Sequence, residues 1–265
     1  MCTLSVITQE NGYLLAMNRD EKITRGVGEG PETQDLEGPE TQDLNGTTAI
    51  YPSDGAGGTW IAANEYGISL ALLNWNDVVR RPLDIRKARS RGGIIPGLAS
   101  SSRMAELQAA FGVSDLERIQ PFRLVAIFPS EQTIGEWRWD GSRLTFQAQG
   151  WHSHHWFSSS LSDRQAESLR GVACHNAQNE SDTRSAPWLR RVHASHAGGL
   201  GPFSLCVHRN DVRTLSYSEV MVTPTSVQMG HFQDSPCAMT QIHPIKFERA
   251  DCLDPAVWSV GSSAS

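Results

Sequence analysis

Polar and apolar residues alternate over the first part of the chain in a pattern that predicts a β-hairpin. Residues 3–7 combine this alternation with β-branched side chains, and residues 13–17 are typical of a returning strand. Asn11-Gly12 between the two segments is a common signal for a hairpin turn. We therefore expect the chain to fold back on itself here.

Beyond this hairpin, the apolar pattern predicts blocks of strands separated by helical segments. The helical segments begin near Ile94, Asp163 and Ala186, and Gly112 is a natural stop for the first of them. Strands are expected at 59–62, 68–74, 123–128, 133–139, 144–146, 203–208 and 212–222, with a last strand around Met229 and Phe232. This order of elements favours the α+β class.

Residues 26–56 carry the weakest fold signal, and we expect them to form a surface-loop insertion. They contain an eight-residue tandem duplication, 30–37 followed by 38–45, whose copies differ only at the last position. The duplicated segment is acidic, contains Gly and Pro, and is poor in large apolar side chains, which is typical of exposed loops.

The composition narrows the classes of protein. A chain of 265 residues with 39% hydrophobic side chains is long enough for one sizeable core, so we expect a single domain over 1–265. The formal net charge is −6, and basic residues cluster only at 80–81 and 86–91, which argues against a nucleic-acid partner. No apolar run approaches the roughly 20 residues that span a bilayer, and the first strand is too short and polar for a signal-peptide core. We therefore expect a cytoplasmic protein.

The cysteines and histidines give no strong metal signal. Five cysteines are scattered along the chain without a Cys-x-x-Cys pair, which favours reduced thiols over a disulfide framework or a structural zinc site. His152 and His154 would share one face of a strand, with His155 beside them. Flanking tryptophans and the lack of a supporting Asp, Glu or Cys nearby favour packing instead. We expect no metal site and no cofactor.

Cys2 is the strongest candidate for chemistry, because removal of Met1 would make it the N-terminal residue. The aminopeptidase that removes initiator methionines accepts small second residues such as Cys. A free α-amine, with an ordinary pKa of roughly 7.7 to 8.0, would then act as the base for the thiol of the same residue.

The predicted hairpin brings residues 18–20 opposite residues 2–4, so Arg19 or Asp20 is expected within reach of the Cys2 thiol. A guanidinium there favours the thiolate, and a carboxylate can hold the amine or the Arg. On local chemistry alone, the simpler explanation is an incidental Cys near the N-terminus followed by a solvated charged turn.

Three groups of residues resemble a known family: Met1-Cys2, Asn18-Arg19-Asp20-Glu21 followed by Arg25, and the stretch 57–60 that leads into 64–67 and 72–74. They resemble the family named for its Asn-Arg-Asp-Glu motif (NRDE), also called the transport and Golgi organisation protein 2 family. Segments 204–209 and 214–217 look like its later strands. That family is similar to N-terminal nucleophile (Ntn) hydrolases of the bile salt hydrolase and penicillin V acylase kind. The resemblance implies a four-layer αββα sandwich of two antiparallel sheets flanked by helices.

The resemblance also implies site residues. In those hydrolases the N-terminal Cys is the nucleophile, the second strand supplies an Arg and an Asp, and an Asn helps to bind the oxyanion. By position, these roles fall on Cys2, Arg19, Asp20 and Asn74. Asn74 also ends a predicted buried strand beside a Gly-rich loop, where it either aims a donor at a substrate oxygen or caps the following turn.

Two features depart from the pattern of those hydrolases. Ser159 and Ser160 stand where they place a second site Asn, and their late active-site Arg has no assignable equivalent, since Arg209 lies beside a turn. We take Trp60, Ser159 and Ser160 as candidate substrate-binding residues.

Together these observations predict an N-terminal-cysteine hydrolase that cleaves a small acyl amide through a thioester after removal of Met1. The alternative is a non-catalytic carrier on the same fold that binds haem, lipid or acyl-coenzyme A. Acyl transfer to an amine would differ only in the acceptor. The expected ligand is a small-molecule acyl amide or a lipid-like molecule, and homo-oligomerisation is left open.

Overall fold

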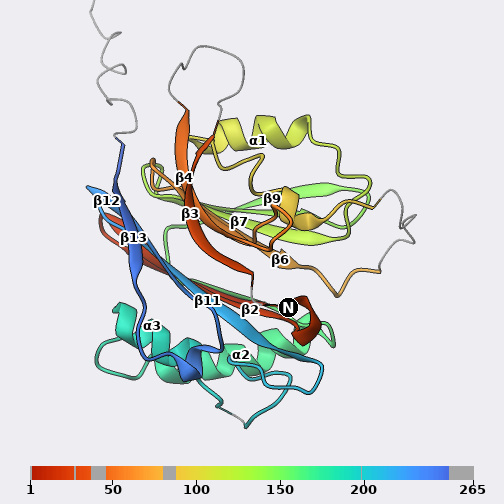
Figure 1. The fold of residues 1–265 in the computed structure, drawn as a ribbon, viewed down its shortest axis with the longest axis vertical. Coiled ribbons are helices and arrows are strands. Elements are labelled where there is room, and N and C mark those ends of the chain that lie inside the picture. The colour runs from red at the N-terminus through yellow and green to blue at the C-terminus, as the bar shows by residue number, and fades with distance from the viewer. Residues whose placement is uncertain (1, 27, 37–45, 80–87, 198, 251–265) are drawn as a thin grey trace, which may run out of the picture.

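The computed structural model describes residues 2–26, 28–36, 46–79, 88–197 and 199–250. These residues form two antiparallel β-sheets that pack face to face, with helices on the two outer sides (Figure 1). The predicted α+β class and the αββα order of layers are confirmed. None of the helices in this part of the chain has the length and apolar character needed to cross a bilayer.

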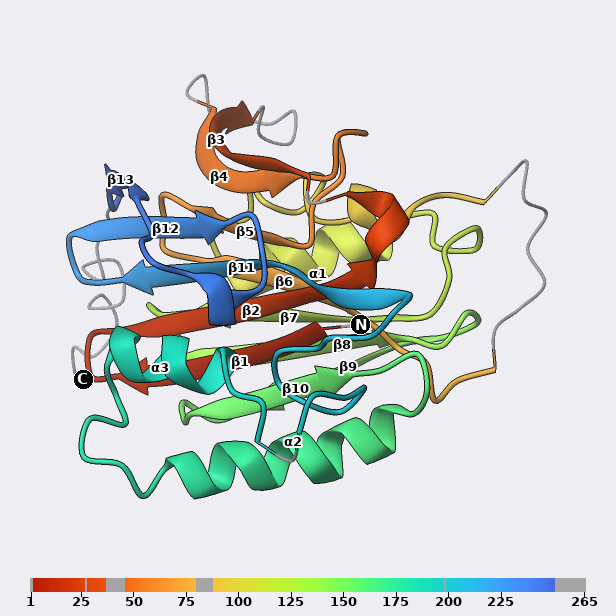
Figure 2. The ribbon, with the colours of Figure 1, turned by 60° about the horizontal axis from the view of Figure 1, so that its bottom comes forward.

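The first sheet has six strands in the order β10-β1-β2-β11-β12-β13. The strands are β1 (Cys2–Gln9), β2 (Gly12–Lys22), β10 (His154–Ser158), β11 (Val212–Val222), β12 (Ser226–Phe232) and β13 (Pro244–Glu248). The predicted hairpin is present, and its register places Cys2 opposite Arg19. Figure 2 shows β1 and β2 near the middle of this sheet, between β10 and β11.

The second sheet has seven strands in the order β3-β4-β5-β6-β7-β8-β9. They are β3 (Glu29–Leu36), β4 (Thr47–Ser53), β5 (Ile61–Asn64), β6 (Ser69–Asn74), β7 (Phe122–Phe128), β8 (Thr133–Trp139) and β9 (Leu144–Gln149). Each strand pairs with its neighbour in sequence, which is the order of a meander, although a long connection separates β6 from β7.

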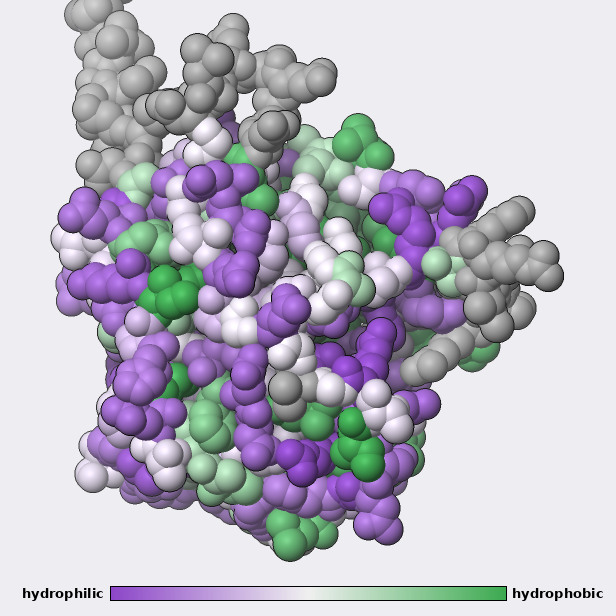
Figure 3. Space-filling model, in the orientation of Figure 1, coloured by the Kyte–Doolittle hydropathy of each residue, from purple (hydrophilic) through white to green (hydrophobic). Residues whose placement is uncertain are grey.

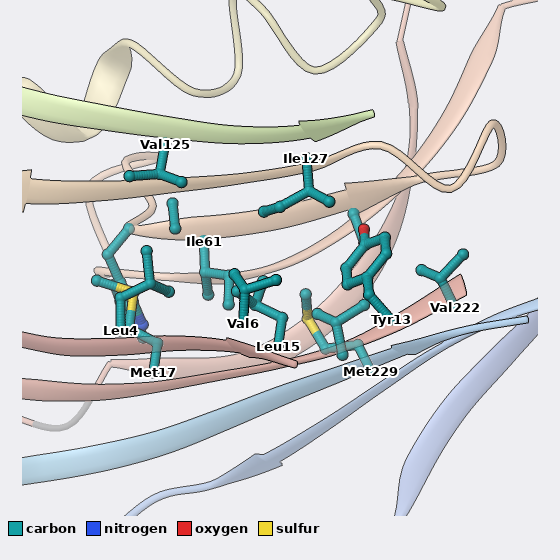
Figure 4. Close-up of a cluster of buried hydrophobic side chains, with 14 of the residues drawn as sticks. Leu4, Val6, Tyr13, Leu15, Met17, Ile61, Val125, Ile127, Val222 and Met229 are labelled. Carbon is teal, nitrogen blue, oxygen red and sulfur yellow. The ribbon is translucent and has the colours of Figure 1, made fainter. Parts of the chain in front are cut away.

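Helices close the sandwich on both outer faces. α1 (Met104–Gly112) covers the seven-stranded sheet, whereas α2 (Asp163–Ala177) and α3 (Ala186–His193) cover the six-stranded sheet (Figures 1 and 2). Three short 3₁₀ turns complete the described elements: η1 (Ile23–Arg25), η2 (Arg91–Gly93) and η3 (Pro236–Ala238). Each interface between layers has its own apolar cluster. Figure 4 shows the cluster between the sheets, where Leu4 and Leu15 of one sheet face Val125 and Ile127 of the other.

Strand alternation on β1 decides which residues face which layer. Cys2, Leu4 and Val6 belong to the cluster between the sheets. Thr3 and Ser5 point the other way, toward the helices, where Thr3 bonds to Arg170 of α2. The N-terminal Cys therefore faces the space between the sheets.

Several sequence-based expectations are wrong in detail. The range 26–56, predicted as a surface-loop insertion, contains β3 and β4, while 37–45, with the second copy of the duplication, lies outside the described residues. β3 was hidden because it is a mostly exposed edge strand without an apolar face. The helix expected from Ile94 begins only at Met104, and 203–208 contributes a single bridge, His208 to Arg213.

Candidate active site

Cys2 lies at the floor of a cavity of about 300 Å³. The predicted residues Arg19, Asp20, Trp60 and Asn74 line the same cavity. The other lining residues are Glu21, Arg25, Asp54, Thr59, Leu72, Ala88, Arg89, Ser90, Arg91, Gly92 and Gln120. Polar and charged side chains share this lining with Trp60, Leu72 and Ala88, so the cavity offers both polar and apolar surface to a ligand.

Arg19 reaches the cavity from β2, directly beside Cys2. Its guanidinium carbon lies 4.4 Å from the centre of the Trp60 ring, which is a cation–π distance, and its Nη1 donates to the Gly26 carbonyl at 3.2 Å. Burial lowers the pKa of Arg19, yet a guanidinium keeps its charge under all ordinary conditions. The predicted binding residue Trp60 therefore supports a positive charge beside the thiol.

Asp20 follows Arg19 on β2, and its carboxylate is held on the helix side of the sheet. Its Oδ2 accepts from Arg170 Nη2 at 3.2 Å, and its Oδ1 accepts from the Thr214 hydroxyl at 2.6 Å. A β-bulge in β11 lies between Thr214 and Ser216, opposite Asp20 and Arg19, and such bulges re-aim side chains near functional sites. Toward Cys2, Asp20 offers its backbone amide, which donates to the thiol.

Arg170 is fully buried and joins Asp20 to the N-terminal strand. Its Nη1 donates to the Cys2 carbonyl at 3.3 Å and to the Thr3 hydroxyl at 2.8 Å. Sequence reasoning missed this residue. The available signal was spacing, because Asp163, Ala166, Arg170 and Cys174 all lie on the buried face of α2.

Ser158 is a second residue that sequence reasoning missed. It pairs with Cys2 across β10 and β1, and its hydroxyl accepts from the Cys2 backbone nitrogen at 3.0 Å. The predicted Ser159 and Ser160 are not among the lining residues in the described part of the chain. Ser159 instead donates its backbone N–H to Asp163 at 2.6 Å, and Ser160 is exposed. The serine next to the N-terminus is therefore Ser158.

The opposite wall of the cavity comes from the seven-stranded sheet. Asn74 ends β6 and is half-buried, so its amide can reach a ligand in the cavity. The Thr59 N–H donates to the Gly92 carbonyl at 3.0 Å, and a Cβ on Gly58 would lie only 3.1 Å from the Gly92 Cα. Glycine at both positions permits this close approach of the two backbones beside the cavity.

Burial raises the pKa of the Cys2 thiol, and the Asp20 carboxylate acts in the same direction. With Met1 in place, the positive charge of the chain's N-terminus opposes this effect, and so does the Asp20 backbone N–H. A thiol with a raised pKa needs a base close by, and an α-amine with an ordinary pKa of roughly 7.7 to 8.0 is such a base.

The strand histidines and the arginine considered from sequence do not line this cavity. His155 bonds to the Ser5 hydroxyl at 2.8 Å on the helix side of β10, whereas the His154 ring packs on Trp156. Arg209 pairs with Asp211 at 3.0 Å, and it does not line the cavity.

Comparisons with known proteins agree with this architecture. The model of the family described as Transport and Golgi organisation 2 matches residues 1–169. Among solved structures, the mutant C2A conjugated bile acid hydrolase from Clostridium perfringens has a TM-score of 0.57 and 12% identity, covering 92% of both chains. Penicillin V acylase from Agrobacterium tumefaciens has a TM-score of 0.51 and 13% identity, covering 94% of this chain and 86% of that one.

A further similar structure is the Caenorhabditis elegans ortholog of N-acylethanolamine-hydrolyzing acid amidase, with a TM-score of 0.52, 10% identity and coverage of 84% of this chain and 93% of that one. No curated protein sequence matches the chain. At these low identities, the likeness of the solved structures shows a shared fold.

Proposed function

The chain belongs to the Transport and Golgi organisation 2 family, and from this premise we propose that it is an N-terminal-cysteine hydrolase that cleaves a small acyl amide. The observation that carries the proposal is the placement of Cys2. Its thiol lies in a polar cavity beside Arg19, and its backbone nitrogen lies 3.0 Å from the Ser158 hydroxyl. Proteins of similar fold include, by name, a conjugated bile acid hydrolase, a penicillin acylase and an acid amidase.

Removal of Met1 would leave the Cys2 nitrogen as a free amine at the position where it now contacts Ser158. The amine takes the thiol proton as the sulfur attacks the amide carbonyl carbon. It then returns that proton to the leaving nitrogen as the C–N bond breaks, and a thioester remains on Cys2. Water attacks the thioester, the acid leaves, and the thiol is restored.

Two neighbours supply charge stabilisation in this proposal. Asn74 donates its amide to the oxyanion that forms in each tetrahedral intermediate, a contact whose loss typically lowers rate by about 10² to 10³. Arg19, supported by Trp60, favours the thiolate over the thiol. Asp20 acts from the other side of the strand, where it anchors Arg170 and through it the Cys2 carbonyl.

The lining of the cavity combines charged groups with apolar surface, so it can contact both parts of an acyl amide. Four arginines and the carboxylates of Glu21 and Asp54 contribute charge, whereas Trp60, Leu72 and Ala88 contribute apolar surface.

The experiment is an intact mass measurement before and after exposure to an acylating lactone, with the modified peptide mapped. We expect Met1 to be absent and a single acyl group on Cys2, and we expect the Cys2→Ala variant to remain unlabelled. The mapped peptides also report on Cys237, the exposed thiol among the described cysteines, which we expect to remain unlabelled. Retention of Met1, or label that falls on Cys237 rather than on Cys2, would contradict the proposal.

A further inference from the structure

Four metal-binding side chains converge outside the Cys2 cavity. His196, Cys206, His208 and Cys237 each offer one ligand atom, and these atoms all lie within 4.8 Å of one another. The residues come from two separate parts of the chain, the connection between α3 and β11 and the η3 turn. All four lie beyond residue 169, where the match to the family model ends.

We propose that these four side chains form a zinc site of the Cys₂His₂ type. The distances fit a tetrahedral ion. Zn–S bonds of about 2.3 Å and Zn–N bonds of about 2.0 to 2.1 Å place neighbouring sulfur and nitrogen ligands about 3.6 Å apart. His208 Nε2 lies 3.4 Å from Cys206 Sγ and 3.3 Å from Cys237 Sγ, close to those edges.

Hydrogen bonding within the cluster is incomplete without an ion. The single His208 nitrogen contacts both sulfurs, so one N–H or one lone pair would have to satisfy two thiols. His196 Nε2 is buried and has no hydrogen-bond partner in the described part of the chain. The two imidazole rings lie 5.0 Å apart between centroids and at 63° to each other, so their approach is not a stacked packing contact. A zinc ion would use all four groups at once.

The donor set selects the kind of ion. Two sulfurs and two imidazole nitrogens are soft and borderline ligands, which favour zinc and disfavour Mg²⁺ or Ca²⁺, whose sites are built from oxygen. Four protein ligands leave no open position for water or substrate, so the site would be structural. Each thiol that binds gives up its proton to solvent as the Zn–S bond forms.

The position of the cluster gives it a task in the fold. Thr214, which donates to Asp20, lies between the two ligand-bearing segments: the Val207 N–H donates to its hydroxyl at 2.8 Å, and the Ser235 hydroxyl donates to its carbonyl at 2.7 Å. An ion that ties His196, Cys206 and His208 to Cys237 would clamp both segments around Thr214. It would thereby hold Thr214 in the position from which its hydroxyl donates to Asp20.

The first test is the metal content of the purified, untagged protein kept under reducing conditions. We expect about one zinc per chain by elemental analysis, as four ligands imply. Cobalt added to chelator-stripped protein should give a thiolate-to-cobalt absorption band and return the melting temperature lowered by the chelator. This arm needs no variant and so does not depend on whether a variant folds.

The second test uses substitutions. Cys206→Ser and His208→Asn should each lose the zinc and the cobalt band, whereas His175→Asn, which changes an exposed histidine on α2, should keep both. Full zinc content in a Cys206→Ser, Cys237→Ser double variant would overturn the proposal. Absence of zinc and of the cobalt band in the reduced wild-type chain, or a Cys206–Cys237 disulfide found in its place, would also overturn it.

Discussion

Replacing Arg170 with Met tests whether a buried ion pair holds the N-terminal strand in place. The wild-type guanidinium donates to Asp20 Oδ2, the Cys2 carbonyl, the Thr3 hydroxyl and the Pro202 carbonyl. Met has a similar length but no donor, so the variant leaves the carboxylate without its cation and the carbonyls without this donor. Breaking one side of a buried pair typically costs about 3 to 5 kcal/mol. We expect a loss of that size in the free energy of unfolding.

The assay is urea unfolding followed by fluorescence and far-UV circular dichroism. The dependence of the unfolding free energy on urea concentration should be the same in wild type and variant, so that only the urea midpoint of unfolding changes. Arg164→Met, an exposed change on the same helix, is the matched control and should alter stability by no more than about 0.5 kcal/mol. Adding Asp20→Asn to Arg170→Met removes the uncompensated charge. The double variant should therefore lose less than the sum of the two single losses.

This reasoning also predicts an effect on chemistry. Because Arg170 holds the Cys2 carbonyl, Arg170→Met should slow acylation of Cys2 at temperatures where the variant is fully folded. Two results together would refute the conclusion that the Asp20–Arg170 pair holds the N-terminal strand in place. They are a stability loss below about 1 kcal/mol for Arg170→Met and strictly additive effects of the Asp20 and Arg170 changes.

Three further predictions follow from single contacts. Ser158→Ala should slow lactone labelling of Cys2 without changing the fold, since only the hydroxyl at 3.0 Å from the Cys2 nitrogen is lost, and unchanged labelling kinetics would argue against its role. Burial lowers the pKa of His193 to about 3. Below pH 6.5, the unfolded chain therefore binds a proton on this imidazole that the folded chain does not bind. Stability should then fall by up to about 1.4 kcal/mol per pH unit as pH drops below 6.5, and His193→Gln should reduce that slope in urea titrations at several pH values. Gly12→Ala should lower the melting temperature by several degrees, because its Cβ would lie 2.0 Å from the Val222 carbonyl oxygen; an unchanged melting temperature would show that the strands separate freely there.

The fold could be predicted where a pattern and a turn signal agreed. The alternation on either side of Asn11-Gly12 predicted both strands of the first hairpin. A turn centred on Asn11-Gly12 would place Cys2 opposite Glu21, whereas the observed turn at Glu10-Asn11 pairs Gln9 with Gly12 and Cys2 with Arg19. β3 could not be predicted in this way, because its residues are mostly exposed and its pairing depends on β4, which lies beyond residues 37–45. β13 is likewise an exposed edge strand, and its apolar alternation is weak.

The site was predictable only in part. Short sequence motifs pointed to four residues that line one cavity in the structure: Cys2, Arg19, Asp20 and Asn74. Arg170 and Ser158 reach Cys2 through tertiary packing and strand pairing, across 168 and 156 positions in the chain. A single sequence gives no account of such distant contacts. The cluster around His208 was missed for the same reason, since Cys237 lies far along the chain.

The motif of Asn18, Arg19, Asp20 and Glu21 gains its meaning from the alternation of β2. Arg19 faces the cavity, whereas its neighbours face the helices. The Asn18 amide donates to the carbonyls of His193 and Leu205, which fastens the end of α3 and the segment before Cys206 to the strand. Asp20 fastens α2 in the same way. One strand thus offers a charge to the cavity on one face and ties down two helices on the other. Substitutions at 18 and 20 should therefore act mainly on stability, and those at 19 on reactivity.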